Sequence, residues 1–411
     1  MLALLFMGIL SLAFDIQQVE ASGTIYISSD YTFTSNIYDT IIVTADNIII
    51  DGAGYTVQGT GSGTGIDLSL RNNVTIKNVE VTNFHYGIFL VVSSNNTVTG
   101  NTASNNDYGI LLWSSSNNTV TGNTASNNAY GIDLYDSSNN TVTGNTASNN
   151  SYGIHLVVSS NSTVTGNTAS NNSVGIYLSS SSNNRITGNT ASNNDDHGIY
   201  LRISSNNVLF HNNLIDNANN VEVSPANPNV LDNGIEGNYW SNYTGVDLNQ
   251  DGIGDLPYVI DSDNIDNYPL MGMFHSFNTS VGEYVNVVSN STIESFQHFE
   301  SNSTIIIHVS NMTANQTHGF CRISIPYEVM SEPFNVTIDG ANPTYWNYTL
   351  YDNGTHRWIY FEYQHTTREI VIIPEFQSFL ILPLFMIAIL LAVIIVRRKH
   401  RHTCRERKVK F

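Results

Sequence analysis

The middle of the chain repeats itself every 22 residues. The segment Asn96–Asn106 recurs in the next four units, in full or with small variations. Weaker copies extend the array to about eight units, from Asp51 to about Val223. One glycine marks each central unit, with a single extra residue before the last: Gly87, Gly109, Gly131, Gly153, Gly175 and Gly198. A fixed period of this length indicates a solenoid, in which each unit packs mainly against its two neighbours.

The composition of each unit favours β-structure. Thr-Val-Thr and Gly-Ile-x-Leu alternate with period two, and β-branched residues dominate. Asn, Gly and Ser recur every few residues, which suits turns and disfavours helices. A unit of three short strands cannot bury its own apolar residues, but stacked units can when each strand pairs with its copy one coil away. Eight coils at about 4.8 Å per coil predict a rod about 38 Å long.

Three rows of apolar side chains are predicted to point into the rod. The first is Val98, Val120, Val142, Val164, Ile186 and Leu209; the second is Ile88, Ile110, Ile132, Ile154, Ile176 and Ile199; the third is Leu90, Leu112, Leu134, Leu156, Leu178 and Leu201. Asparagines in the same register are expected to bond to one another and to turn backbone: Asn101, Asn123, Asn145, Asn167, Asn189 and Asn212. A leucine-rich horseshoe needs several spaced leucines per unit. Asn, Thr and Gly predominate instead, so we predict a right-handed parallel β-helix.

This segment closely resembles the NosD-type repeats of the carbohydrate-binding and sugar-hydrolase β-helix superfamily. The runs Gly237–Tyr243, Asp251–Asp255 and Asp266–Leu270 are similar to the end block of archaeal members. The resemblance covers about residues 24–272 and implies a right-handed parallel β-helix. It also implies two alternative functions, a polysaccharide-active lyase or hydrolase and a copper-handling protein.

The remaining chain divides into four further segments. Residues 1–21 are predicted to be a signal peptide, because the apolar run Leu2–Phe14 is too short to span a bilayer and a small-x-small sequence follows at Val19–Ala21. The β-helix with its end block is assigned to residues 22–272, and the β-rich runs of residues 273–373 predict a small β-sandwich-like domain. Residues 374–396 and 397–411 form the C-terminal part.

The C-terminal part predicts a membrane anchor. The apolar run from Ser378 to Val396 would be about 28 Å long as a helix, close to the thickness of a bilayer core. The basic residues 397–411 that follow predict a cytoplasmic tail, with everything before the helix outside. Pro374-Glu375-Phe376 before such a helix and tail resembles the PEF-type sorting signals of archaeal surface proteins. That resemblance implies tail removal and lipid attachment; an uncleaved single-pass anchor is the alternative, and both predict a cell-surface location.

The distribution of charge limits the partners of the external part. The net charge is −19, but eight of the 15 basic residues lie in the last 15 residues of the chain. The preceding residues carry seven basic and 33 acidic side chains. This excess of negative charge would repel the phosphate backbone of a nucleic acid, which excludes nucleic acid as a partner. Two cysteines are too few for a disulfide framework. Extracellular glycans, cations and other cell-surface proteins remain as candidate partners.

The outer side of the Gly-Ile-x-Leu strand carries the candidate ligand-binding residues. Its aromatic side chains at regular spacing can stack on sugar rings, while Asp133 and His155 would bond to hydroxyl groups. The predicted strip is Phe89, Trp113, Asp133, Tyr135, His155, Tyr177 and Tyr200. Another domain or protein could instead cover it, since exposed aromatic patches usually mark an interface. A second ladder, Tyr86, Tyr108, Tyr130 and Tyr152, followed by Val174 and His197, indicates rigidity of the stack.

An enzymatic alternative rests on the same strand. Stacking places Asp133 and His155 on neighbouring coils about 5 Å apart, where they could act as acid and base. Asp195-Asp196-His197, at the coil with the inserted residue, is the other cluster. Such pairs are more often exposed cross-strand contacts of small energetic value. No pair is specific enough to name a catalytic residue, so we assign none.

A calcium loop is the best candidate metal site. Side-chain oxygens of Asp247, Asn249, Asp251 and Asp255, with the Ile253 carbonyl, fit a structural calcium site around the bend at Gly252. The twelfth position is Tyr258 rather than a glutamate, so Asp261 or Asp263 would have to complete the ligands. An ordinary Asp/Gly-rich turn is the alternative. Copper prefers His, Met and Cys ligands, and the repeats contain only scattered histidines, which disfavours copper.

About 16 Asn-x-Ser/Thr sequons occur. Stacking is expected to block those within the repeats, so the better glycosylation candidates follow Asn242. The sequence therefore predicts an exported, membrane-anchored cell-surface β-helix protein, either glycan-binding or adhesive and structural. The polysaccharide-active enzyme and the copper-handling protein remain the alternatives.

Overall fold

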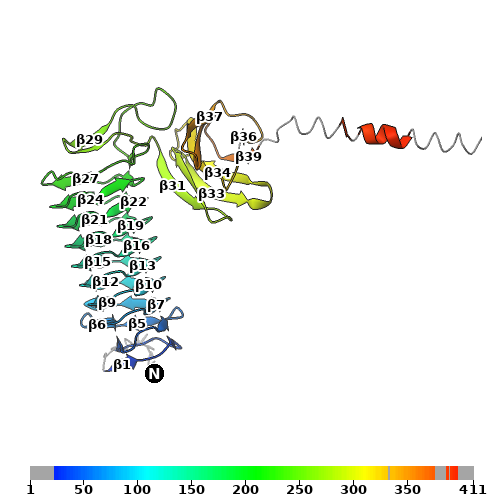
Figure 1. Cartoon of the computed structure of the whole chain (residues 1–411). Coiled ribbons are helices and arrows are strands. Elements are labelled where there is room, and N and C mark those ends of the chain that lie inside the picture. Colours follow the sequence, from blue (N-terminus) through cyan, green and yellow to red (C-terminus); the bar gives the residue numbers. More distant parts are fainter. Residues whose placement is uncertain (1–22, 332–333, 375–385, 388, 397–411) are drawn as a thin grey trace, which may run out of the picture. The chain divides into compact units, whose positions relative to one another are not determined.

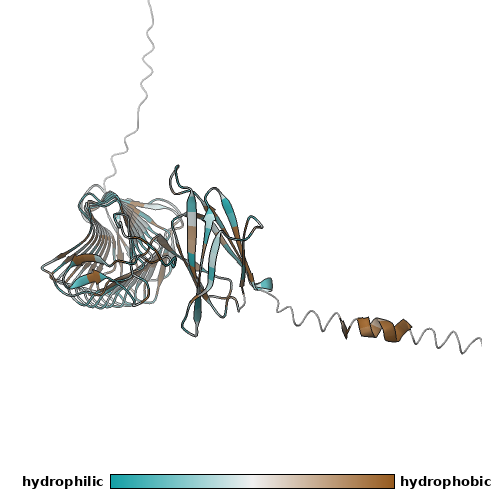
Figure 2. Ribbon diagram, turned by 90° about the horizontal axis from the view of Figure 1, so that it is seen from above, coloured by the Kyte–Doolittle hydropathy of each residue, from teal (hydrophilic) through white to brown (hydrophobic). Residues whose placement is uncertain are grey.

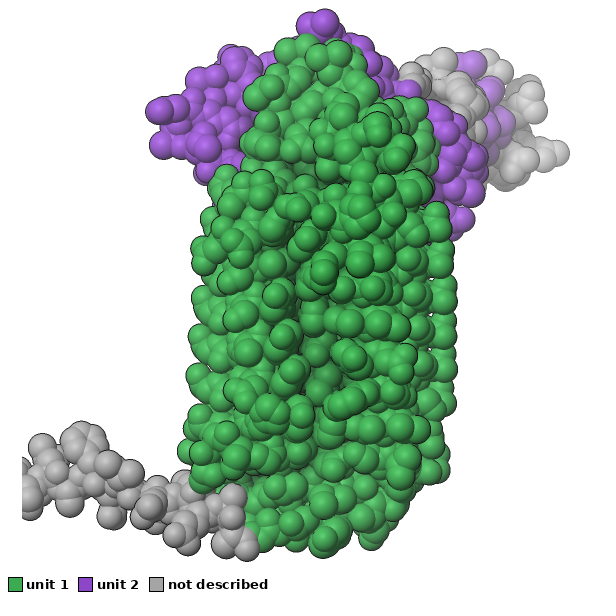
Figure 3. Space-filling model, turned by 90° about the vertical axis from the view of Figure 1, so that its left-hand side faces the viewer, with its two compact units in different colours: residues 1–246, 254–270 green, residues 247–253, 271–411 purple. Residues whose placement is uncertain are grey.

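The computed structural model describes residues 23–331, 334–374, 386–387 and 389–396. Contacts divide the chain into two compact units (Figure 3). The first contains the described residues up to Val246 and Gly254–Leu270, and the second contains Asp247–Ile253 and the described residues from Met271 onward. Both units consist of β-sheet, as predicted. The predicted signal peptide and basic tail lie outside the described residues.

The first unit is a right-handed parallel β-helix built from three sheets (Figure 1). Sheet A has ten strands: β1 (Thr24–Ile27), β3 (Thr40–Val43), β6 (Thr64–Asp67), β9 (Tyr86–Val91), β12 (Tyr108–Trp113), β15 (Tyr130–Tyr135), β18 (Tyr152–Val157), β21 (Val174–Ser179), β24 (His197–Arg202) and β27 (Asn219–Ser224). Seen along its axis in Figure 2, the coils lie over one another.

Two shorter-stranded sheets complete each coil. Sheet B contains β2 (Tyr31–Thr32), β4 (Ile49–Asp51), β7 (Thr75–Lys77), β10 (Thr97–Thr99), β13 (Thr119–Thr121), β16 (Thr141–Thr143), β19 (Thr163–Thr165), β22 (Arg185–Thr187) and β25 (Val208–Phe210). Sheet C contains β5 (Thr56–Gln58), β8 (Glu80–Thr82), β11 (Thr102–Ser104), β14 (Thr124–Ser126), β17 (Thr146–Ser148), β20 (Thr168–Ser170), β23 (Thr190–Ser192), β26 (Asn213–Ile215) and β28 (Tyr239–Trp240). A hairpin of β29 (Tyr258–Asp261) and β30 (Asn264–Asp266) follows.

The β-helix is longer than the repeat pattern predicted. About eight units from Asp51 were expected, but sheet A begins at Thr24 and has ten strands. The first coils lack the Asn and Gly consensus, yet they keep buried residues at the inward positions, such as Ile41 and Ile50. Strand pairing and burial of the inward side chains thus continue in coils that lack the repeat consensus.

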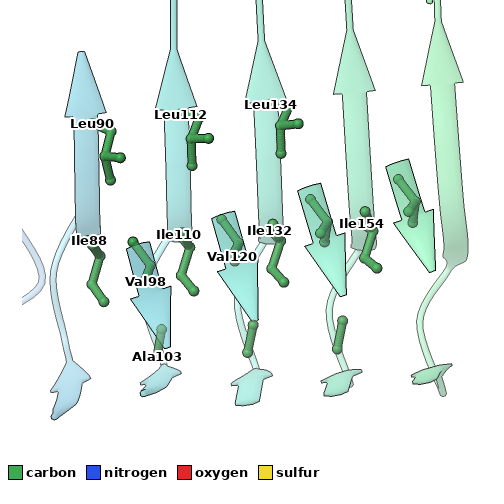
Figure 4. Close-up of a cluster of buried hydrophobic side chains, with 14 of the residues drawn as sticks. Ile88, Leu90, Val98, Ala103, Ile110, Leu112, Val120, Ile132, Leu134 and Ile154 are labelled. Carbon is green, nitrogen blue, oxygen red and sulfur yellow. The ribbon is translucent and has the colours of Figure 1, made fainter. Parts of the chain in front are cut away.

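The predicted inward rows form the core (Figure 4). Valine, isoleucine and leucine of all three rows are at most 1% exposed. Sheet C adds a row that the sequence analysis missed: Ala103, Ala125, Ala147, Ala169, Ala191 and Leu214. Alanine was not recognised as a core residue because it carries little hydrophobic signal. Its small side chain fits opposite the larger rows of the other two sheets.

The predicted asparagine ladder is present and is one of several. Asn123 Nδ2 donates to Val98 O at 2.9 Å and to Asn145 Oδ1 at 3.0 Å, while its own Oδ1 accepts from Asn101 N at 2.9 Å. Two further ladders run through Asn96, Asn118, Asn140, Ser162, Asn184 and Asn207, and through Asn106, Asn128, Asn150, Asn172 and Asn194. A serine ladder runs through Ser93, Ser115, Ser137, Ser159, Ser181 and Ser204. These side chains satisfy buried turn backbone that strand pairing leaves unbonded.

The end block closes this stack. Asp266 Oδ2 accepts hydrogen bonds from Asn238 N and from the indole Nε1 of Trp240, both at 2.8 Å. Gly237 leaves room for this carboxylate, because a Cβ there would lie 1.8 Å from Asp266 Oδ1. Asn212 bonds in turn to Asn238. The motif Gly-Asn-Tyr-Trp and the later Asp266 therefore terminate the ladder that begins at Asn101.

The second unit is the predicted β-sandwich. One antiparallel sheet contains β31 (Met273–Asn278), β32 (Tyr284–Ser289), β35 (His318–Pro326), β38 (His356–Gln364) and β37 (Tyr345–Asp352). The other contains β33 (Thr292–Phe299), β34 (Thr304–Ser310), β39 (Arg368–Pro374) and β36 (Phe334–Ile338), with the short 3-10 helix η1 (Glu300–Asn302) between β33 and β34. Both sheets contribute to one buried core.

The predicted anchor is only partly covered by the structure. Its described residues, 386–387 and 389–396, are helical. Across the part of the chain that the structure describes, no helix has both the length and the hydropathy to span a bilayer. Glu375 and Phe376 of the PEF motif lie outside the described residues. The anchor stays a prediction.

Candidate functional site

The outer face of sheet A carries the side chains of the predicted strip. Their register is the predicted one: Asp133 pairs with Leu111 and His155, and Trp113 pairs with Tyr135. Tyr177 and Tyr200 are likewise neighbours on β21 and β24. The stacking of near-identical coils therefore arranges these residues in two adjacent columns, one with Asp133, His155, Tyr177 and Tyr200 and the other with Trp113 and Tyr135, as their spacing indicated.

The predicted tyrosine ladder forms and joins the strip. Tyr108 and Tyr130 stack with ring centroids 4.7 Å apart, and Tyr130 and Tyr152 with centroids 5.2 Å apart. Tyr152 then contacts Tyr177 at 5.5 Å, and Tyr177 contacts Tyr200 at 5.0 Å. The two rows that the sequence analysis treated separately thus form one continuous aromatic ladder across the coils.

Asp133 and His155 lie underneath this ladder. His155 Nδ1 and Asp133 Oδ1 are hydrogen-bonded at 2.9 Å. The histidine ring lies 5.0 Å from Tyr152, 5.1 Å from Tyr177 and 5.2 Å from Tyr130 between ring centroids. Asp133 is 4% exposed and His155 is 9% exposed. Both side chains are therefore buried rather than solvent-facing, because alternation along a strand does not show which neighbouring side chains cover an outward residue. Their bonding to sugar hydroxyls stays a prediction.

This packing raises the pKa values of two tyrosine hydroxyls of the ladder. Burial raises the pKa of Tyr130 above its usual value, and the neighbouring Tyr152 and Asp133 add to the rise. Burial likewise raises the pKa of Tyr108, with Tyr130 as the next cause. Both hydroxyls therefore stay protonated to a higher pH than an exposed tyrosine does.

The exposed aromatic pair of the strip lies at the ends of β12 and β15. Trp113 and Tyr135 are each 44% exposed, and their rings meet edge-to-face with centroids 5.6 Å apart. Each is followed by a polar residue in the turn, and Ser114 Oγ donates to Asp136 Oδ2 at 3.2 Å. We call Trp113, Ser114, Tyr135 and Asp136 the edge site. It combines two exposed aromatic rings with a hydroxyl and a carboxylate.

Two valines flank the edge site. Val92 is 57% exposed and Val158 is 51% exposed, and both have a positive φ of 50°. These valines occupy, in the neighbouring coils, the turn position that Ser114 and Asp136 occupy. A β-branched residue at positive φ is strained, and valine in a sequence indicates strand. Sequence reasoning therefore did not predict that Val92 and Val158 lie in exposed turns, or that Ser114 and Asp136 lie beside the exposed aromatic pair.

The other strip members belong to the ladder. Phe89 is half-buried and stacks on Tyr86 with centroids 4.6 Å apart. Tyr177 and Tyr200 are also half-buried. At the coil with the inserted residue, His197 Nε2 lies 2.6 Å from Glu222 Oε2 and its ring stacks on Tyr200. Asp195 and Asp196 are exposed there. His197 thus extends the ladder in the predicted register with Val174.

The predicted calcium loop forms a tight turn. Asp247 accepts hydrogen bonds from Asp251 N at 3.0 Å and Gly252 N at 2.8 Å. Burial raises the pKa of Asp247, and these two backbone donors oppose the rise. Arg322 Nη1 donates to Asp251 O at 2.7 Å. The boundary between the two units runs through the loop, with Ile253 in the second unit and Gly254 in the first.

The histidines of the β-helix do not fit a copper site. Each pairs with a carboxylate on a neighbouring coil: His85 with Asp107, His155 with Asp133, His197 with Glu222, and His211 with Glu236. In the described part of the chain, no three His, Cys, Asp or Glu side chains are placed to hold a metal ion. Copper favours several nitrogen or sulfur ligands together, and these dispersed His–carboxylate pairs do not supply them.

Comparison with known proteins gives one family match. Residues 40–245 match the family described as "Periplasmic copper-binding protein (NosD)". No curated protein matches the chain. The matched segment comprises most of the β-helix and includes the edge site.

Solved structures similar to the chain include several polysaccharide-active proteins. A mutant of the periplasmic alginate epimerase AlgG is 20% identical, with a TM-score of 0.40, over 49% of this chain and 55% of that one. The A-module of the Azotobacter vinelandii mannuronan C-5 epimerase AlgE6 is 14% identical, with a TM-score of 0.39, over 48% and 63%. Pectate lyase Pel9A is 18% identical, with a TM-score of 0.32, over 56% and 72%. The match spans little more than half of the first of these chains.

Proposed function

Since the chain belongs to the NosD family but its described histidines do not make a copper site, we propose that it is an exported surface protein whose rod binds extracellular glycans. The exposed pair Trp113 and Tyr135 carries this proposal. Two aromatic rings on adjacent coils offer the apolar faces on which sugar rings stack, and Asp136 and Ser114 offer partners for hydroxyl groups. Contiguous exposed apolar surface often marks an interaction site, and these two rings are in contact with each other.

The charge of the chain favours a neutral or cationic polymer. The residues before the tail carry 33 acidic and seven basic side chains. An acidic polysaccharide would be repelled by this field, especially at low salt. The proposed ligand is therefore a neutral glycan of the cell surface or surroundings, bound by stacking rather than by ion pairs. A purely adhesive or spacer role for the rod is the competing account.

The proposal also includes the location of the protein and a structural calcium ion. The apolar run before the basic tail supports export with the β-helix outside, held by a transmembrane helix or by lipid after tail removal. The sequence pattern of the Asp247–Asp255 loop is the basis for one structural calcium ion. The three carboxylates are not gathered around one point in this turn, so they would have to move together on binding, which calorimetry on the intact protein tests. An absence of heat at millimolar calcium would reject the ion without affecting the glycan proposal.

The test uses residues 22–373, which include both units, and a panel of neutral and acidic polysaccharides. One assay measures retention on each polymer and newly formed reducing or unsaturated ends. Trp113→Ala and Tyr135→Ala should each weaken retention about fivefold, because an aromatic contact contributes on the order of 1 kcal/mol. Tyr26→Ala, which removes a 68% exposed tyrosine in the first coil, is the matched control and should bind normally.

The outcomes separate the candidate functions. Retention without new ends, lost in the Trp113 and Tyr135 variants only, supports the binding rod. If new reducing or unsaturated sugar ends form with the unsubstituted protein but not with Asp133→Asn, the protein is a polysaccharide-active enzyme and the binding proposal is rejected. No retention on any polymer leaves the structural or adhesive rod as the better account.

A further inference from the structure

One turn of the β-helix exposes an asparagine in coil after coil. The turn precedes the strands of sheet B, and its asparagine has a positive φ between 54° and 60°. The exposed residues of this acceptor row are Asn73, Asn95, Asn117, Asn139 and Asn161. The following residue is the buried ladder residue, such as Asn118 after Asn117. Two consecutive asparagines therefore have opposite environments.

Backbone bonds to the next coil hold Asn73, Asn139 and Asn161 in place while their side chains lie at the surface. At the surface, Asn73 Nδ2 donates to Asn47 Oδ1 at 2.9 Å and Asn95 Nδ2 donates to Ser94 Oγ at 3.3 Å. Asn139 N donates to Ser160 O of the next coil at 3.0 Å, and Asn161 N donates to Ser182 O at 3.3 Å. Asparagine tolerates the left-handed region better than other side chains with a Cβ. The turn is consequently a fixed, solvent-facing display of carboxamide groups, one per coil.

A threonine follows two residues after each member of the acceptor row. These are Thr75, Thr97, Thr119, Thr141 and Thr163, the first residues of β7, β10, β13, β16 and β19. Each acceptor thus begins an Asn-x-Thr sequon without proline. The next coil breaks the pattern: Asn183 has the same conformation, with a φ of 58°, but Arg185 stands in the threonine position.

We infer that the acceptor row is an N-glycosylation surface, an inference that rests on the export included in the proposed function. The expectation that stacking blocks sequons in the repeats does not hold for exposure, because stacking buries the middle residue of each sequon and leaves the acceptor asparagine at the surface. The sugar donor is a polyprenyl-phosphate-linked oligosaccharide. The asparagine Nδ2 forms a bond to the anomeric carbon, the bond from that carbon to the phosphate oxygen breaks, and Nδ2 releases one proton as the lipid phosphate leaves.

The coil spacing limits how many acceptors carry glycans together. Neighbouring acceptors are about 4.8 Å apart, which is the spacing of paired strands. A hydrated oligosaccharide is wider than one coil. Two glycans therefore fit without steric overlap only when their acceptors lie at least two coils apart, a distance of about 9.6 Å. We therefore expect glycoforms modified at Asn73, Asn117 and Asn161, or at Asn95 and Asn139, rather than at all five sites.

The experiment is mass spectrometry of the full chain recovered from the cells that make it. Surface exposure is established first by protease treatment of intact cells. Fragments are then sequenced by electron-transfer dissociation, which keeps sugars on the asparagine. Sugar is expected on acceptor-row asparagines and absent from Asn183, the internal control with the same turn.

Substitutions at one coil give a matched pair. Thr119→Val keeps a β-branched side chain but destroys the sequon, so sugar at Asn117 should disappear. Thr119→Ser keeps the hydroxyl, so sugar should remain. A surface-exposed chain without sugar on any acceptor-row asparagine would overturn this inference while leaving glycan binding intact. A chain found only inside the cell would reject both this inference and the exported surface protein.

Discussion

At the residue scale, the central coils contain two glycines that occupy their positions for different physical reasons. Gly153 has no positive φ, but a Cβ there would lie 2.6 Å from the carbonyl oxygen of Gly175 in the next coil. Gly144 has a φ of +62°, and nothing lies within 4 Å of its Cβ position. The equivalent position is Asn78 in an earlier coil and His211 in a later one, with φ of 53° and 59°. The first glycine is needed for close approach and the second for its conformation.

This difference predicts a large effect on stability for one glycine substitution and a small effect for the other. Gly153→Ala should lower the free energy of unfolding by about 1 to 3 kcal/mol, because neighbouring backbone has to move to accept the methyl group. Gly144→Asn should change it by about 0.5 kcal/mol or less, since asparagine adopts this conformation elsewhere in the same rod. Urea unfolding of residues 22–373 would measure both. Equal destabilisation by the two changes would contradict the close-approach explanation.

At the element scale, the coil is the building unit of the β-helix. Most ladder bonds join residues 22 or 25 positions apart, which means that each coil is bonded to its immediate neighbours. No described strand of the central coils pairs with a strand farther away than the adjacent coil. Stability is then close to a sum over coils and the contacts between them. The number of coils is consequently free to change as long as the register is kept.

Deletion of one whole coil tests this independence. Removing residues 162–183 joins Asn161 to Asn184 and restores the same turn, so the shortened chain should fold with β-sheet circular dichroism and a cooperative transition. Removing only residues 162–172 displaces the three sheets from their inward register, so this control should be protease-sensitive. Equal resistance to protease in the two deletion variants would argue against coil-by-coil stacking. The edge site lies outside both deletions.

At the scale of the whole molecule, the two units contain buried groups with opposite pH dependence. In the first unit, burial raises the pKa of Asp266 to about 6 from 3.8. In the second, burial lowers the pKa of His275 to about 4 from 6.5, and its Nε2 lacks a partner among the described residues. The folded state holds its proton on Asp266 more tightly than the unfolded state does. It holds a proton on His275 less tightly.

The sign of each effect follows from linkage. The stabilisation that protonated Asp266 adds to the free energy of unfolding is fully present below pH 3.8 and is lost as the pH rises through about 6. The stabilisation that neutral, buried His275 adds to the free energy of unfolding is present above pH 6.5 and is lost as the pH falls towards 4. Lowering the pH from 6.5 to 4 should therefore strengthen the end block of the first unit and weaken the second unit, each by roughly 1 to 3 kcal/mol.

Hydrogen exchange followed by mass spectrometry can read the two units separately. Peptides around Trp240 report the end block, and peptides of β31 and β32 report the second unit. Asp266→Asn should flatten the first pH dependence, and His275→Phe should flatten the second. Parallel pH trends in both units, unchanged by these substitutions, would show that other groups dominate.

The candidate site was predictable in register but not in exposure. The 22-residue spacing placed Trp113 beside Tyr135 and Asp133 beside His155 correctly. Alternation along a strand tells whether a side chain points away from the core, yet it does not tell what lies above that side chain. Tyr130 and Tyr152 pack against the ring of His155, to which Asp133 is hydrogen-bonded, and these contacts depend on the packed aromatic ladder.

The repeat alone was sufficient to predict the parallel β-helix, its inward rows and its pairing register, because near-identical units have one stacking that buries every apolar row at once. The β-rich runs that follow likewise predicted the β-sandwich. The folded molecule was needed to establish the number of coils, the burial of Asp133 and His155, the exposed turns at Val92 and Asn117, and the role of Asp266 at the end of the ladder. These features depend on turn conformation and on contacts between neighbouring coils, and the sequence of a single coil does not contain either.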